Sequence, residues 1–121
     1  MASLFEIGAG KALGYTSGGA VTQATDKSTG VTLNQAAGQI TTTDASLAGG
    51  AEVSFTVTND KVTASDVVLV NHASAGTAGS YLVQANSLAA GSFNITVANL
   101  STGSLGEAIV LNFVVIKGAS S

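Results

Sequence analysis

The sequence predicts an all-β protein, a jelly-roll-like antiparallel β-sandwich of about eight strands that follows an extended N-terminal arm. Short runs rich in Val, Ile, Thr and Phe recur along the chain, and clusters of Gly, Ser, Asn and Asp separate them. The apolar spacing that an amphipathic helix requires is nearly absent. With 121 residues, the chain is long enough for one domain and too short for two ordinary ones.

The first segment, residues 1–19, differs in composition from the rest of the chain. It is rich in glycine and has no sustained apolar period, so it cannot form a core of its own. Its apolar residues are nevertheless too many for a purely solvating tail. We expect an extended arm that becomes ordered on a neighbouring subunit, with a frayed terminus as the alternative. The residues expected to dock this arm are Leu4, Phe5, Ile7, Leu13 and Tyr15.

Residues 20–121 are expected to form the single β-sandwich domain. Its first three strands are the less regular runs Ala20–Thr25, Gly30–Asn34 and Gln39–Thr43. Helical pattern is nearly absent, and residues 28–37 and 60–65 could hold at most a helical turn. Proline is absent, so Gly, Asn, Asp and Ser must supply all of the turn chemistry.

The next two strands carry stronger patterns. In Glu52–Thr58, the apolar Val53, Phe55 and Val57 alternate with hydroxyl residues, which predicts a strand with one face in water. The following run, Asp66–Asn71, instead contains four consecutive apolar residues. A strand that is apolar on both faces lies either at the centre of a sandwich or beneath a partner subunit.

Three further strands complete the domain. Ser80–Asn86 is less regular, whereas Ser92–Ala98 repeats the alternation of Glu52–Thr58. The last strand, Ala108–Lys117, is apolar on both faces, with Ile109, Leu111, Phe113 and Val115 on one of them. The residues assigned to the core or to a trimer interface are therefore Val67, Val68, Leu69, Val70, Val110, Val114 and Ile116.

The low charge content bears on what surrounds the domain. Only 9% of the residues are charged, against about 25% in an average globular protein, and 45% are hydrophobic. Soluble monomers usually carry a mixed, charged surface. We therefore expect other protein chains to cover part of the exterior; the alternative is a surface made soluble by Ser, Thr, Asn and Gly.

Charge and hydropathy also exclude several partners. The net charge is −3, and the only cationic side chains are four scattered lysines, so direct binding to nucleic acid is not expected. No apolar run approaches the ~20 residues of a membrane-spanning helix. Glu6 lies where the apolar core of a secretory signal would run, which predicts synthesis in the cytoplasm.

The sequence contains no recognisable catalytic, cofactor or metal site. Cysteine is absent, and the seven acidic residues lack the spacing of a calcium loop. His72 is the single histidine and has no nucleophile or second ligand close in sequence, so a hydrogen-bonded histidine just past a strand is expected. Gly8–Lys11 lacks the context of a phosphate loop. We therefore expect neither an enzyme nor a cofactor.

Five segments of the sequence carry a likeness to known proteins: Val21–Asn34, Gly38–Thr41, Ala51–Asn59, Ala78–Tyr81 and Val110–Gly118. They resemble segments of small structural proteins of tailed bacteriophages. The resemblance implies a capsid decoration, or cement, protein: a homotrimer on the outer surface of the virion that clamps neighbouring major capsid proteins. The alternative is a head-fibre or receptor-binding module that binds glycans through the loops at 72–79 and 101–106.

Overall fold

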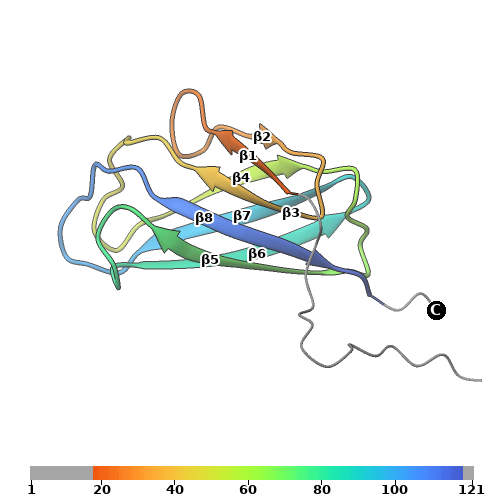
Figure 1. The fold of residues 1–121 in the computed structure, drawn as a ribbon. Helices are drawn as coiled ribbons and strands as arrows, with labels where there is room; N and C mark the ends of the chain where they lie inside the picture. The colour runs from red at the N-terminus through yellow and green to blue at the C-terminus, as the bar shows by residue number, and fades with distance from the viewer. Residues whose placement is uncertain (1–17, 119–121) are drawn as a thin grey trace, which may run out of the picture.

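The structure, a computed structural model, describes residues 18–118. These residues are all-β, without a helix, and their eight strands form two four-stranded sheets (Figure 1). The two sheets share one hydrophobic core, which agrees with the predicted β-sandwich. The strands are β1 (Gly19–Thr22), β2 (Val31–Thr32), β3 (Ala37–Thr41), β4 (Glu52–Thr58), β5 (Val67–Ser74), β6 (Tyr81–Ala89), β7 (Ser92–Asn99) and β8 (Val110–Ile116).

The strand order is β1-β3-β8-β5 in the first sheet and β2-β4-β7-β6 in the second. The chain changes sheet after each of its first five strands, then forms the β6–β7 hairpin and returns to the first sheet as β8. Because β1 and β3 are joined through the opposite sheet, as are β2 and β4, each pair runs parallel. The sheets are therefore mixed, which corrects the expectation of antiparallel sheets. The jelly-roll path stays a prediction.

Alternation within the strands confirms the predicted faces. Phe55 and Val57 of β4 point into the core, where they lie opposite Ile95 and Phe93 of β7. From the other sheet, β8 contributes Leu111, Phe113 and Val115, which are also buried. The rings of Phe93 and Phe113 meet across the sandwich with their centroids 5.6 Å apart. Burial of each such side chain contributes about 1.5–3 kcal/mol to folding.

The observed strand boundaries differ from the predicted ones where pairing overrides local pattern. β5 does not end at Asn71; it continues through His72 to Ser74 because β8 pairs with it along this length. His72 therefore lies within a strand rather than after one. In contrast, the second strand shrinks to Val31–Thr32, the only two residues that pair with β4. The arm residues Leu4, Phe5, Ile7, Leu13 and Tyr15 lie outside the described residues.

A buried lysine fastens one end of the sandwich. Lys27 is 4% exposed, and its Nζ donates hydrogen bonds to the backbone oxygens of Ala45 and Glu107, each at 2.8 Å, and to that of Thr43. Burial lowers the pKa of this ammonium group, although the charges of Asp44 and Glu107 oppose the shift. One side chain thus joins the loops that follow β1, β3 and β7.

Candidate interaction surface

The outer face of the first sheet is apolar and carries no charged side chain within the described strands. Three large side chains are exposed there: Val67 at 52%, Leu69 at 55% and Ile116 at 44%. Monomeric proteins rarely leave several large apolar side chains side by side in water. We call this surface the apolar face; its residues are Ala20, Thr22, Ala37, Gln39, Thr41, Val67, Leu69, Asn71, Val110, Asn112, Val114 and Ile116.

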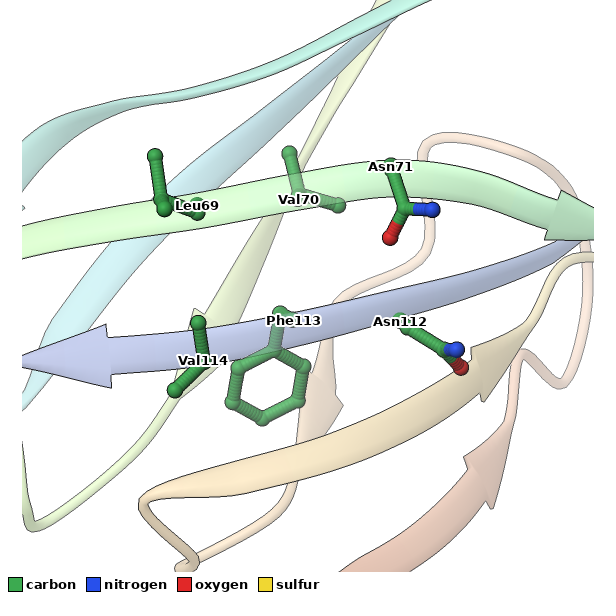
Figure 2. A pocket seen from close by; sticks show the side chains of 6 residues that line it. All are labelled: Leu69, Val70, Asn71, Asn112, Phe113 and Val114. Atoms are coloured by element: carbon green, nitrogen blue, oxygen red, sulfur yellow. The ribbon is translucent and has the colours of Figure 1, made fainter. Parts of the chain in front are cut away.

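The register between β5 and β8 brings the apolar side chains together. Val67 lies opposite Ile116, and Leu69 lies opposite Val114. The next pair, Asn71 and Asn112, places two amides side by side, as Figure 2 shows. A shallow hollow of about 390 Å³ lies along β5 and β8 and is lined by Leu69, Val70, Asn71, Asn112, Phe113 and Val114.

The amides continue as a row across the sheet. Gln39 on β3 lies opposite Asn112, and its Nε2 donates a hydrogen bond to Asn112 Oδ1 at 3.4 Å. The row therefore runs from Gln39 through Asn112 to Asn71. An amide both donates and accepts, so this row can pair with another amide when water is excluded.

The outer face of the second sheet is mostly polar, and its one large exposed apolar side chain within the described strands is Leu82, at 58%. We call this surface the polar face; its hydroxyl and amide side chains bond to one another, and its residues are Glu52, Ser54, Thr56, Thr58, Leu82, Gln84, Asn86, Ser92, Asn94, Thr96 and Ala98. Ser54 and Thr96 share a hydrogen bond of 2.7 Å, and Thr56 donates to Asn94 at 2.9 Å. Asn86 also donates to Thr96, at 2.9 Å. This face suits exposure to water, so the two sides of the sandwich are chemically distinct.

The structure divides the predicted core-or-interface residues into two groups. Val68 is buried in the core, and Val70 is partly buried against it. Val67, Leu69 and Ile116 are exposed on the apolar face, where the half-buried Val110 and Val114 accompany them. Successive strand residues point to opposite sides of a sheet, which is why a continuous apolar run supplies both groups.

Comparison with family models, curated proteins and solved structures found no match. Residues 18–118 contain no helix that is long and apolar enough to cross a membrane. In the same residues, no three potential metal ligands among His, Asp and Glu gather at one point.

An ion pair fixes the strands of the apolar face at one end. The Asp66 side chain is 1% exposed and contacts the Lys117 ammonium at 2.5 Å. It also accepts hydrogen bonds from the backbone N–H groups of Thr63 and Gly118, at 2.8 and 2.9 Å. Residue 118 must be glycine for this closure, because a Cβ there would lie 1.7 Å from the Ser65 carbonyl oxygen. Together these contacts hold the start of β5 to the end of β8.

This carboxylate makes stability dependent on pH. The hydrogen bond from Lys117, followed by that from Gly118, holds the pKa of Asp66 far below its ordinary value. A carboxyl whose pKa is lower in the folded state stabilises the fold above its unfolded pKa, about 3.9, and loses that contribution on acidification. We expect Asp66→Asn to lower the free energy of unfolding at pH 7.

The difference in the free energy of unfolding between wild type and Asp66→Asn should become smaller as the pH falls from 5 to 2. Urea unfolding at each pH, at one protein concentration, measures this difference. Asp60→Asn is the control, because Asp60 is exposed and its contact with Lys61 spans 3.7 Å. A gap that stays constant over this pH range would contradict the assignment.

A second cluster lies at the other end of β5, and sequence analysis missed it. The Tyr81 hydroxyl donates to Glu107 Oε2 at 2.9 Å, while the Thr77 hydroxyl donates to Oε1 at 3.0 Å. Desolvation acts to raise the pKa of Glu107, but hydrogen bonds from Thr77 and Tyr81 outweigh it and leave the pKa lowered. Burial, together with the Glu107 carboxylate, raises the pKa of Tyr81 to about 12. Tyr81 is thus a persistent donor, and Glu107 is a persistent acceptor.

His72 completes this end of the sandwich. Its ring packs edge-on against Tyr81, with centroids 5.4 Å apart. Its Nε2 lies 2.6 Å from the Ala75 carbonyl oxygen and 3.1 Å from that of Ser74, so Nε2 carries a proton. The expected hydrogen-bonded histidine is confirmed. The only sequence signal for the cluster was the presence of ionisable residues in a chain that has few of them.

Proposed function

We propose that the chain is a capsid decoration protein that binds the outer surface of a phage head as a homotrimer and stabilises contacts between major capsid proteins. The observation that carries the proposal is the uncharged apolar face with exposed Val67, Leu69 and Ile116. The resemblance of the sequence to small phage structural proteins supplies the biological setting. The jelly-roll-like path and the docking arm at residues 1–19 belong to the same proposal.

A homotrimer accounts for the composition as well as for the face. Charged residues are depleted at the centres of protein interfaces, and this face has none within its described strands. Burial of apolar area supplies about 25 cal/mol per Å², so covering this face stabilises an assembly. A trimer on a local threefold axis also engages three capsid sites at once and gains avidity from individually weak contacts.

Capsid binding tests the proposal directly. Purified protein is mixed with undecorated phage capsids, the capsids are sedimented, and bound protein is quantified; native mass spectrometry gives the mass of the free protein. The proposal expects a trimer that co-sediments with saturable occupancy. A free monomer, or a protein left wholly in the supernatant, would overturn it.

The arm gives the accompanying prediction. Changing Phe5 and Ile7 to Ser should weaken capsid attachment at least tenfold, because two apolar anchors of the arm are lost, while the trimer mass stays the same. Lys11→Ser is the matched control, since it changes the arm without removing an apolar side chain. Equal capsid occupancy of the double variant and the wild type would refute the docking role.

A head-fibre or glycan-binding module is the second candidate. The loop after β5 encloses a hollow of about 240 Å³ that includes His72, Ser74 and Tyr81, at the position expected for a sugar site. A glycan array probed with wild-type protein and with His72→Ala tests this function. Glycan binding that is lost in His72→Ala would favour the glycan-binding module over capsid decoration. An array without signal would exclude glycan binding.

A further inference from the structure

The two edge strands of the first sheet are unequal and unpaired on their outer sides within the described residues. β1 is four residues long and β5 is eight. Native proteins usually protect a long edge with Pro, with charges, with a β-bulge or by covering it, because its free backbone groups attract another strand. β5 contains no Pro and no Lys, its one irregularity lies near its end between His72 and Ser74, and its regular part exposes Val67 and Leu69. This edge has the properties of a strand that pairs with another chain.

The strand directions show which edge of a neighbouring copy could pair with β5. β1 is parallel to β3, β3 is antiparallel to β8, and β8 is antiparallel to β5. β1 and β5 therefore run in the same direction at opposite edges of one sheet. Rotation of copies about an axis parallel to the strands preserves this direction, so β5 of one copy can pair in parallel with β1 of the next. Such a contact joins two different surfaces, and it forms a closed ring when the rotation between neighbours is a whole fraction of a turn.

We propose that three copies close their first sheets into a three-sided ring, with β5 of each subunit beside β1 of the next and the apolar face turned towards the threefold axis. This inference rests on the proposed homotrimer and adds its geometry. The occupant of the apolar face is thus a second and third copy of this chain.

The chemistry of the apolar face fits this arrangement. Identical faces that carry no charge meet at an axis without repulsion, and Val67, Leu69 and Ile116 lose their exposure to water. The amide row of Gln39, Asn112 and Asn71 can exchange hydrogen bonds with its copies, because amides both donate and accept. The polar face, whose side chains already satisfy one another, then forms the outside of the ring.

The point at which the described residues begin fits as well. They begin at Gly18, directly before β1, and 17 residues precede it in the sequence. A chain of this length spans up to about 55–60 Å when extended. At each corner of the ring, the arm would therefore start beside β5 of the neighbouring subunit and could extend from there towards the capsid.

Engineered cysteines test the ring, because the chain has none of its own. Ala20 on β1 and Asn71 on β5 both belong to the apolar face. The variant carrying Ala20→Cys and Asn71→Cys is oxidised and analysed by non-reducing electrophoresis. A second variant pairs Ala20→Cys with Leu69→Cys and covers a shift of two residues in register. We expect at least one of the two to form covalent dimers and trimers that a thiol reductant dissolves.

The controls separate the outcomes. Ala20→Cys with Thr56→Cys on the polar face should remain uncrosslinked. Ready dimerisation of Asn71→Cys alone would indicate a twofold β5–β5 contact and overturn the ring. A trimer by native mass without crosslinks in either variant would also overturn the ring, while the proposed decoration function would stand. A monomeric native mass would contradict both the ring and the proposed trimeric decoration protein.

Discussion

Leu69→Lys is expected to abolish self-association while leaving the fold intact. Leu69 is 55% exposed in the single chain, so an exposed lysine there changes the free energy of unfolding by about 0.5 kcal/mol or less. In the proposed trimer, the same side chain would face sister chains on a surface without a counterion. Burial of an unpaired charge costs several kcal/mol. Since each 1.4 kcal/mol corresponds to a tenfold change in affinity, we expect at least about a hundredfold weakening.

Leu82→Lys is the matched control for this prediction. Leu82 is also a strand leucine and is 58% exposed, but it lies on the second sheet, opposite Ala98. Sedimentation velocity over a concentration series should give a monomer for Leu69→Lys and a trimer for Leu82→Lys. If Leu69→Lys remained trimeric, or if both variants dissociated, the apolar face would not be the subunit contact.

Lys27→Met is expected to cause the largest loss of stability from a single polar residue. Methionine has a similar length but donates no hydrogen bond, so the backbone oxygens of Ala45 and Glu107 lose their Nζ partner. The Thr43 oxygen keeps one bond, from the Thr42 hydroxyl. Each buried acceptor left without a partner costs about 1–3 kcal/mol. The variant no longer has to desolvate the Lys27 ammonium group, and this gain offsets part of the loss. We therefore expect the free energy of unfolding to fall by about 2–4 kcal/mol.

Urea unfolding at a fixed protein concentration measures the loss, because trimer formation would otherwise shift the apparent stability. The control is Lys61→Met, a change of the same chemistry at a side chain that is 53% exposed. It should alter the free energy of unfolding by about 0.5 kcal/mol or less. Equal stability of the two variants would show that the three carbonyl oxygens find other donors when Lys27 is absent.

The contrast between Lys27 and Lys61 also shows where sequence analysis stops. All four lysines looked alike in the sequence, as scattered cations in a weakly charged chain. Only the folded chain brings the carbonyl groups of residues 43, 45 and 107 around one ammonium group. Asp66 and Glu107 were hidden in the same way, because their partners come from segments far away in the sequence.

Strand pairing could not be predicted from the sequence either. Local pattern predicted the strands at Glu52–Thr58 and Ser92–Ala98, and their inward residues, because alternation depends only on the pleat of the backbone. It ended β5 three residues early, at Asn71, because the pairing that carries the strand to Ser74 is supplied by β8. It also missed the parallel pairs, which arise because the chain changes sheet between consecutive strands.

The sequence by itself determined that this protein is all-β and that the strands at Glu52–Thr58 and Ser92–Ala98 turn their apolar side chains inward, since these features depend on periodicity and composition. The tertiary structure alone decided that Val68 enters the core while its neighbours Val67 and Leu69 face outward on a surface without charge. A run of consecutive apolar residues has no internal signal for which side is covered. That side is fixed by the second sheet, which packs against only one face of β5 and leaves the other face exposed.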